Sequence, residues 1–427
     1  MLLCSERKNS RMREAVECMQ DSFNGTLGKD RMKKLVFFPS DPISAYIKVG
    51  KSYDYIERYF NPGGYFDEVY CLSPWGDVKE ETIGQIHYIK ASPCKYAEII
   101  KRLQPDVVRG YGGYCCADWI SINKVEGIPT VVSVHDTNPR LIHDSLKYAD
   151  GIICMSKAVE DAVKTLVPDV TSNIWIMPNR IDTELFKNKN DEVFFEKLNN
   201  QYGHTKHILH VGRKAEQKNI DTVIKSLRYV PDDVNCIFVG RGNTEQYKQL
   251  AVEEGVIHRC FFEESVPNSE LPMWYSWADC MCTPSRWEGF GYVFIEAAAC
   301  EAGIVTSNIA PMNEYLTDGL NSILVDDYEN PEKIADAINR VLSNTDDIQQ
   351  MKRAAREVGL KFKKEVIDKE EIAIYEKVMS CKPNNRNYTE LRAQMRKQDI
   401  KRRIKAPLIA MKRAAYKFAK AAWTKSR

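Results

Sequence analysis

The sequence predicts an α/β protein with two doubly wound, Rossmann-like domains that face each other across a cleft. Short, nearly continuous apolar runs alternate with amphipathic helical patterns along most of the chain, which is typical of parallel sheets covered by helices on both faces. The 427 residues are enough for two domains of ordinary size with additional segments. Ligands of such folds bind at the carboxyl ends of the strands, in the cleft.

Apolar runs of strand length recur through both halves of the chain. Helical patterns lie between them, at residues 96–103 and 156–166 in the first half and at 221–230, 244–255 and 331–342 in the second. The predicted strands are residues 34–38, 67–72, 106–110, 130–135, 151–155 and 173–177, followed by 207–212, 235–240, 259–262, 279–283, 303–307 and 322–325.

The change from the first half to the second falls near residues 178–186, where a polar stretch begins. A further helical pattern at 358–379 has no strand after it. We expect a polar leader over 1–31, an N-terminal domain over 32–182, a C-terminal domain over 183–364, a helix over 365–381 that returns to the N-terminal domain, and a basic amphipathic tail over 382–427.

Composition is ordinary for a globular protein, with 44% hydrophobic and 28% charged residues. No segment is long and apolar enough to span a bilayer, and no secretory signal is visible. The 13 cysteines are an odd number, many of them lie in apolar runs, and none forms a zinc-type pair. Buried free thiols indicate a reducing cytosol.

The most informative stretch is PSRWEGFGYVFIE at residues 284–296. A glycine loop that opens a helix presents unpaired backbone N–H groups, and the helix dipole favours negative charge there. Glu288 stands before this loop and Glu296 stands eight residues later. Carboxylates accept hydrogen bonds from hydroxyls, so the pattern indicates a phosphate group flanked by two polyols. A nucleotide-sugar has this chemistry.

The spacing of the two glutamates disfavours a glycosidase. Eight residues of helix separate their backbones by about 12 Å, whereas the two carboxyls of a glycosidase stand about 5–9.5 Å apart. Two binding carboxylates fit this spacing better than an acid/base pair.

A second cluster, HVGRKAEQKNID at 210–221, places Arg213 and Lys218 on one predicted strand-to-helix loop. Both cations can point at a phosphate, Arg as a fork and Lys as a point charge. Basic loop residues are usually only solvated, but this loop lies at the same predicted edge of the domain as Glu288 and Glu296.

These motifs resemble the donor domain of retaining glycosyltransferases of family four, which have the two-domain GT-B fold. GRKAEQKN is followed by an S-x-x-E-G-F-G block ending in a distant Glu. Residues 176–186, 131–136 and 307–326 are similar to the family's linker, its active-site histidine strand and the block that closes its donor site. The similarity covers about residues 33–380.

The resemblance implies a role for each matching residue. Arg213 and Lys218 match the positions that bind the donor diphosphate, Glu288 matches the contact to the transferred sugar, and Glu296 matches the ribose contact. Where the family has a paired-glycine loop, this chain has Gly50, with Ser44, Lys48 and Lys51 nearby. The candidate catalytic residues are His135, Arg213, Lys218 and Glu288; the candidate donor-binding residues are Gly50, Arg213, Lys218, Val266, Gly289, Phe290, Gly291 and Glu296.

The implied activity is transfer of a sugar from a nucleotide-sugar to a glycan or lipid-linked acceptor with retained anomeric configuration, in surface polysaccharide or glycoconjugate biosynthesis. We expect no cofactor and no metal, because the chain supplies the cations that stabilise the departing phosphate. A sugar-nucleotide epimerase, a phosphorylase and a non-catalytic nucleotide-sugar-binding scaffold are the alternatives.

The N-terminal domain would hold the acceptor, and the turn at 109–113 is a candidate for its wall. Residues 386–427 carry 14 Lys and Arg against two acidic residues, and apolar residues recur at helical spacing from Leu408 to Ala422. Residues 400–427 therefore predict a contact with an anionic membrane surface. A solvated tail or a protein partner is an alternative, and we do not expect nucleic acid. The expected location is the cytoplasm, and the tail allows a peripheral position on the inner face of the membrane.

Overall fold

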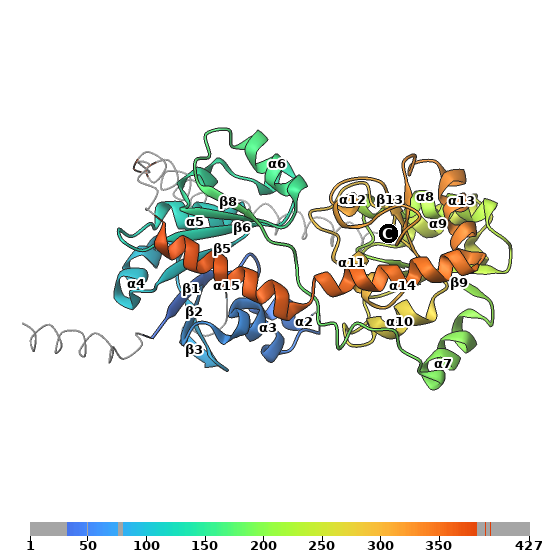
Figure 1. The fold of residues 1–427 in the computed structure, drawn as a ribbon, viewed down its shortest axis with the longest axis horizontal. Coiled ribbons are helices and arrows are strands. Elements are labelled where there is room, and N and C mark those ends of the chain that lie inside the picture. The colour runs from blue at the N-terminus through green and yellow to red at the C-terminus, as the bar shows by residue number, and fades with distance from the viewer. Residues whose placement is uncertain (1–31, 49, 76–79, 382–388, 390–392, 394–427) are drawn as a thin grey trace, which may run out of the picture.

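The computed structural model describes residues 32–48, 50–75, 80–381, 389 and 393. Two α/β domains lie side by side (Figure 1). The predicted leader at 1–31 and, apart from residues 389 and 393, the predicted tail at 382–427 lie outside the described residues, as does the expected membrane contact at 400–427. None of the helices in the described part of the chain has the length and apolar character needed to span a bilayer.

The N-terminal sheet has eight strands in the order β3-β4-β2-β1-β5-β6-β7-β8. All neighbours are parallel except β3 and β4. The strands are β1 Lys34–Phe38, β2 Glu68–Ser73, β3 Glu80–Ile83, β4 Ile86–Lys90, β5 Val107–Tyr111, β6 Thr130–Val134, β7 Gly151–Cys154 and β8 Asn173–Ile176; the helices are α2 Ile43–Lys48, α3 Tyr53–Phe60, α4 Tyr96–Leu103, α5 Cys115–Ile122 and α6 Lys157–Leu166.

The C-terminal sheet has six parallel strands in the order β11-β10-β9-β12-β13-β14. The strands are β9 Lys206–Val211, β10 Val234–Val239, β11 Cys260–Glu263, β12 Cys280–Cys282, β13 Ile304–Ser307 and β14 Ile323–Val325; the helices are α7 Glu192–Tyr202, α8 Ile220–Ser226, α9 Glu245–Glu253, α10 Leu271–Trp277, α11 Tyr292–Ala299, α12 Met312–Tyr315, α13 Pro331–Leu342, α14 Asp346–Lys361 and α15 Lys364–Ser380.

The predicted α/β class is confirmed, and each predicted strand is present within one or two residues. The antiparallel hairpin β3–β4 was not predicted. Its first strand is largely exposed, so the sequence there has no buried apolar run to mark it. The central strand β1 shows the opposite extreme, because Leu35 to Phe38 are fully buried between two helical layers.

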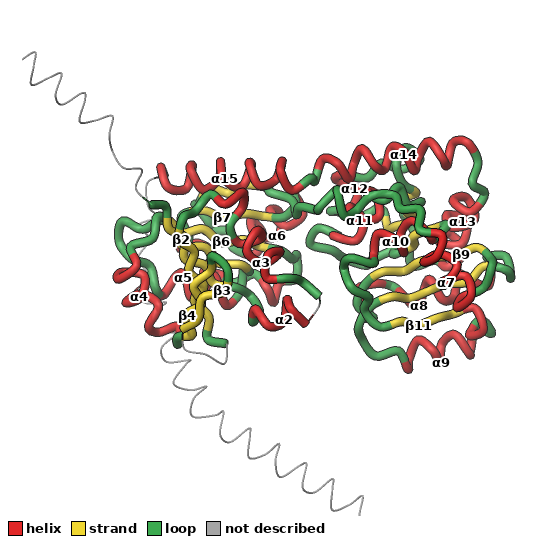
Figure 2. Tube along the Cα trace, turned by 90° about the horizontal axis from the view of Figure 1, so that it is seen from below, coloured by secondary structure: helices red, strands yellow, loops and turns green. Residues whose placement is uncertain are grey.

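Helices α14 and α15 run one after the other along both domains (Figures 1 and 2). Helix α14 packs on α11, and α15 packs on β5 of the N-terminal domain. At the break between them, Ile181 of the first interdomain linker donates its N–H to the carbonyl of Phe362 and accepts from Lys364 at 3.0 Å. The two chain crossings between the domains are thus joined by backbone hydrogen bonds.

A buried ionic network fixes α15 to the N-terminal domain and the linker. Glu371 is fully buried and pairs with both Arg109 and Arg180. Burial alone would raise the pKa of Glu371, but the two guanidinium groups lower it. Arg109 is 1% exposed and also bonds the hydroxyls of Ser133 and Tyr375. The expectation that Arg109 lines the cleft is therefore wrong, because its guanidinium is used to hold α15.

Candidate active site

The loop after β9 brings Lys218 to Glu288. Lys218 ends a short turn before α8, and its ammonium pairs with the Glu288 carboxylate in a largely buried ion pair. A side chain at Gly212 would meet the Lys218 aliphatic chain at 3.0 Å, so the glycine gives that chain room to pass. The structure thus joins two residues that the sequence places 70 positions apart.

Other hydrogen bonds fix the Glu288 carboxylate. Ser285 donates its hydroxyl to Oε1 at 2.8 Å, and Gln217 donates its amide to Oε2 at 3.4 Å. Gln217 also donates to the Trp287 carbonyl at 2.8 Å. The carboxylate is held from both sides before any ligand arrives, which is the arrangement that an oriented hydroxyl acceptor needs.

Arg213 is exposed and is linked to this pair through one intermediate residue. Its guanidinium donates to Gln217 Oε1 at 2.9 Å, while Gln217 reaches Glu288. Sequence reasoning did not identify Gln217. The available signal was its position in the same loop, between the two predicted cations, but an uncharged side chain gives no pattern by itself.

The glycine loop after Glu288 contacts the N-terminal domain. A side chain at Gly289 would lie 1.9 Å from the carbonyl oxygen of His135, so only glycine permits this approach. Gly291, with φ of 81°, is the N-cap of α11. Phe290 is buried and packs its ring 5.4 Å from that of Phe362 at the helix break. The glycine loop that is predicted to bind a phosphate therefore also contacts His135 of the N-terminal domain.

His135 follows β6, and among the described residues its Nε2 is buried without a hydrogen-bond partner. Burial lowers the pKa of His135 to about 4, with a further contribution from Arg109. The imidazole is therefore neutral at pH 7 and has a ring nitrogen available to a ligand.

His135 also lines a cavity of about 300 Å³ at the carboxyl ends of the neighbouring strands β1, β5 and β6. Gly112 and Gly113 of the predicted turn lie in its wall. Four tyrosines form much of the remainder: Tyr46, Tyr59, Tyr111 and Tyr114. Of these, Tyr111 belongs to the turn at 109–113 that the sequence predicted, and the other three were not identified from the sequence.

Glu296 lies on α11 and is 4% exposed. Tyr275 donates its hydroxyl to this carboxylate at 3.1 Å. Burial raises the pKa of Glu296 to about 7, against the opposing effects of Lys51 and of the Tyr275 hydrogen bond. Glu296 forms a second polar group, separate from the Lys218–Glu288 pair.

The predicted residues Gly50 and Val266 lie beside this second group. Lys51, next to Gly50, donates to Asn268 Oδ1 at 2.9 Å across the domain interface, and Val266 is two residues from that asparagine. Burial lowers the pKa of Lys51, and the charge of Glu296 opposes this effect. The structure thus gathers His135, Glu288, Lys218 and Gly289 in one group, and Gly50, Val266 and Glu296 near a second.

Two further contacts hold the domains together beside His135. The Ser156 hydroxyl donates to the Gly289 carbonyl at 2.8 Å. Glu314 of the C-terminal domain accepts the backbone N–H groups of Lys157 and Ala158 at 2.8 Å each and thereby caps α6 of the N-terminal domain. Neither residue was identified from the sequence, because the partners of both across the interface lie in distant segments. Ser156 also caps α6 within its own domain, where its hydroxyl accepts the N–H of Val159 at 3.2 Å.

Within the described ranges, no three His, Cys, Asp or Glu side chains gather in a group suited to a metal ion. The cations at the candidate site are those of the chain itself, Arg213, Lys218 and Lys51.

Several known proteins are similar to this chain in sequence. Residues 191–358 match the family Glycosyl transferases group 1. An uncharacterized glycosyltransferase of Methanocaldococcus jannaschii is 25% identical over 327 residues, which cover 70% of this chain and 83% of the relative. The O-antigen chain mannosyltransferase RfbU of Salmonella typhimurium is 28% identical over 49% of this chain and 62% of its own length.

Solved structures share the fold. Sucrose-phosphate synthase from Thermosynechococcus elongatus superposes with a TM-score of 0.66 at 16% identity, over 82% of this chain and all of the other. Anabaena HepE in complex with UDP-glucose gives 0.65 at 17% identity, over 80% and 99% of the two chains. The architecture is therefore the GT-B fold, and the match to the glycosyl transferases group 1 family falls within the C-terminal domain.

Proposed function

We propose that the protein transfers a sugar from a nucleotide-sugar to a glycan or lipid-linked acceptor with retention of anomeric configuration, in surface polysaccharide or glycoconjugate biosynthesis. One observation carries the proposal: the Lys218–Glu288 pair lies beside the Gly289–Gly291 loop, whose backbone contacts His135 of the opposite domain. The similarity to a mannosyltransferase and to a structure holding UDP-glucose supports a nucleotide-sugar donor.

In this proposal the donor diphosphate lies over the first turn of α11, and Arg213 and Lys218 stabilise the negative charge that grows on the departing phosphate. Such preorganised cations lower the barrier without reorganisation at the moment of reaction. Glu288 accepts hydrogen bonds from the transferred sugar. The assumption that one helix spans both glutamates is wrong: α11 begins at Tyr292, so Glu288 lies before it and Glu296 is its fifth residue, about 6 Å along the helix. The buried Glu296 holds the ribose hydroxyls there.

In the proposed mechanism the acceptor hydroxyl attacks C1 on the face from which the phosphate departs, which retains the anomeric configuration. The C1–phosphate oxygen bond breaks, the new glycosidic bond forms on that face, and the acceptor proton passes to the phosphate oxygen. His135 is neutral, and its free Nε2 is available to hydrogen-bond the sugar. The cations of the chain fill the electrostatic role that a metal would otherwise have.

The cavity beside His135 is the proposed acceptor site. Tyrosine combines a flat apolar ring with a hydroxyl, which suits the apolar faces and the hydroxyls of a sugar. This cavity lies at the ends of β1, β5 and β6, so an acceptor hydroxyl bound in it lies next to His135 and the Gly289 loop.

Release of nucleoside diphosphate from a panel of UDP- and GDP-sugars, with and without glycan acceptors, tests the proposal. We expect acceptor-stimulated release, a product whose anomeric proton coupling by NMR matches that of the donor, and undiminished turnover in EDTA. An inverted product would contradict retention. Thermal stabilisation by a nucleotide-sugar without its consumption under any acceptor would instead favour a scaffold.

A further inference from the structure

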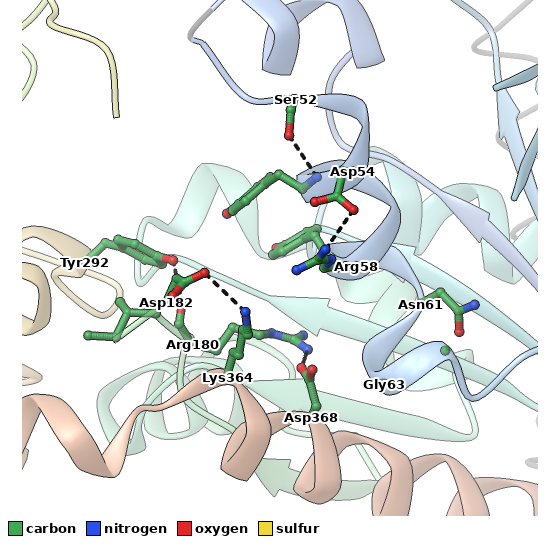
Figure 3. A pocket seen from close by; sticks show the side chains of 14 residues that line it. Ser52, Asp54, Arg58, Asn61, Gly63, Arg180, Asp182, Tyr292, Lys364 and Asp368 are labelled. Atoms are coloured by element: carbon green, nitrogen blue, oxygen red, sulfur yellow. Dashed lines mark hydrogen bonds and ion pairs between the residues drawn. The ribbon is translucent and has the colours of Figure 1, made fainter. Parts of the chain in front are cut away.

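A second cavity, of about 530 Å³, lies at the hinge between the domains. Four segments line it: helix α3 with the turn after it, the linker at 180–182, the first turns of α15, and Tyr292 at the start of α11. Figure 3 shows their side chains pointing toward one another around the cavity. Its lining contains none of His135, Lys218, Glu288 or Glu296, although Tyr55 and Tyr292 in its wall interact electrostatically with Glu296.

The charged side chains of this hinge cavity are balanced. Each cation of the lining has an acidic partner in the same wall: Arg58 with Asp54 at 2.9 Å, Lys364 with Asp182 at 3.1 Å, and Arg180 with Asp368. Because every charge is already paired, the cavity offers hydrogen-bond donors and acceptors without a net attraction for an anion or a cation. A charged ligand would have to separate one of these pairs.

Three tyrosines, Tyr55, Tyr59 and Tyr292, supply the aromatic part of the lining. The Tyr292 hydroxyl donates to the Arg180 carbonyl, which fixes this ring in the wall. Aromatic rings interleaved with paired carboxylates and guanidinium groups match a ligand that has both apolar faces and many hydroxyls. We propose that the hinge cavity binds a neutral carbohydrate, at a site distinct from those for donor and acceptor.

Two features connect this site to the rest of the molecule. Tyr59 lines both the hinge cavity and the cavity beside His135, so its ring is shared between the two. Ile181 and Lys364, which form the backbone hydrogen bonds of the hinge, also lie in the wall. A sugar bound here contacts both chain crossings at once and therefore favours one relative position of the domains.

The proposal is tested by saturation-transfer NMR on the full chain, with glucose, galactose, mannose and N-acetylglucosamine as probes and with excess UDP and GDP present to occupy the donor site. The double variant Asp54→Ala/Arg58→Ala removes one balanced pair whose side chains are 66% and 63% exposed, so folding is preserved. We expect at least one sugar to bind wild type, and the double variant to bind it about tenfold more weakly, as expected for the loss of one or two hydrogen bonds.

Two control variants locate the binding. Lys333→Ala/Asp336→Ala removes an exposed pair on α13 and should bind the sugar as wild type does. Tyr114→Ala alters the proposed acceptor cavity and not the lining of the hinge cavity, so any binding that it loses belongs to the acceptor site, and the binding that it keeps should fall further when Asp54→Ala/Arg58→Ala is added. Equal binding by wild type and the Asp54→Ala/Arg58→Ala variant would overturn the proposal, as would no binding of any probe. Tighter binding of glucose 6-phosphate than of glucose would contradict the charge balance. None of these outcomes depends on transferase activity.

Discussion

The C-terminal domain brings the Lys218–Glu288 pair and Glu296 to the domain interface, whereas the N-terminal domain brings four tyrosines, a neutral histidine and one cation, Lys51. On the C-terminal side, Lys218 and Glu288 are paired and further held by Ser285 and Gln217. On the N-terminal side, His135 has a ring nitrogen without a partner among the described residues, beside a cavity with four tyrosines in its wall.

This difference in side chains matches the difference between the two ligands that the domains are proposed to bind. A diphosphate and its sugar have a fixed charge and fixed hydroxyl positions, so a cross-linked polar group can be preorganised for them. An aromatic wall instead recognises the faces of a ligand and tolerates changes in its hydroxyls. We infer that the C-terminal side sets the chemistry and the N-terminal side sets which acceptor reacts.

Replacing Lys218 should have the largest effect on turnover, and it tests whether the C-terminal side sets the chemistry. Lys218→Met should lower turnover about a hundredfold or more, the usual effect of removing one preorganised group that stabilises transition-state charge. It also leaves Glu288 as an unpaired buried charge, which costs about 3–5 kcal/mol of stability. Turnover is measured by nucleoside diphosphate release per folded molecule, and Lys248→Met, at an exposed lysine on α9, is the control.

The double variant Lys218→Met/Glu288→Gln separates the two effects. Replacing both charges should restore most of the melting temperature, because no unpaired buried charge remains, while turnover stays low. Recovery of turnover in the double variant would show that the pair has only a structural role, and the assignment of chemistry to the C-terminal side would fail.

The pH dependence of nucleotide binding tests the role of Glu296 on the C-terminal side. Glu296 accepts hydroxyls best when ionised, and its pKa is raised to about 7. The affinity for UDP or GDP should therefore rise about tenfold from pH 6 to pH 8 as the carboxyl loses its proton. Isothermal titration calorimetry measures this, and Glu296→Gln should bind more weakly with a flat profile. A pH slope that persists in Glu296→Gln would assign it to another group.

The same group also affects stability. The Glu296 carboxyl has a pKa near its ordinary value of 4.5 in the unfolded chain and about 7 in the folded one, so between these values the folded protein holds the extra proton. Stability contributed by this group is thus lost as pH rises from about 4.5 to 7, by at most about 3 kcal/mol. Glu296→Gln should remove that slope in denaturant titrations.

The sequence was sufficient for the strands and for the two charged loops of the C-terminal domain. Buried parallel strands such as β1 consist of continuous apolar runs, and Lys218 and Glu288 each lie in a short motif whose chemistry can be read locally. The hairpin β3–β4 and Gln217 were missed because an exposed strand and an uncharged side chain have no such pattern.

Residues that act between distant segments could not be predicted. The sequence placed Arg109 in a glycine-rich turn and predicted a cavity wall there, but Arg109 lies inside β5, and its partner Glu371 is 262 positions away on α15. The tyrosine cavity joins the ends of three strands and helix α3, so it becomes visible only when the order of the sheet is known. Contacts across the domain interface, such as Ser156 with Gly289, could not be predicted for the same reason, because their two partners lie in distant segments.

Removing the contact of Glu314 with α6 should have the smallest effect on turnover. It tests whether this contact must hold the two domains together for transfer to occur. Removing an N-terminal cap costs about 1 kcal/mol, so Glu314→Ala should lower turnover about fivefold at limiting donor and increase the radius of gyration by small-angle X-ray scattering. Glu332→Ala, which removes an exposed glutamate from the first turn of α13, should change neither. If Glu314→Ala keeps both the wild-type radius and the wild-type turnover, the contact of Glu314 with α6 is not needed, and the other interface contacts, such as Ser156 with Gly289 and Lys51 with Asn268, suffice to hold the two domains.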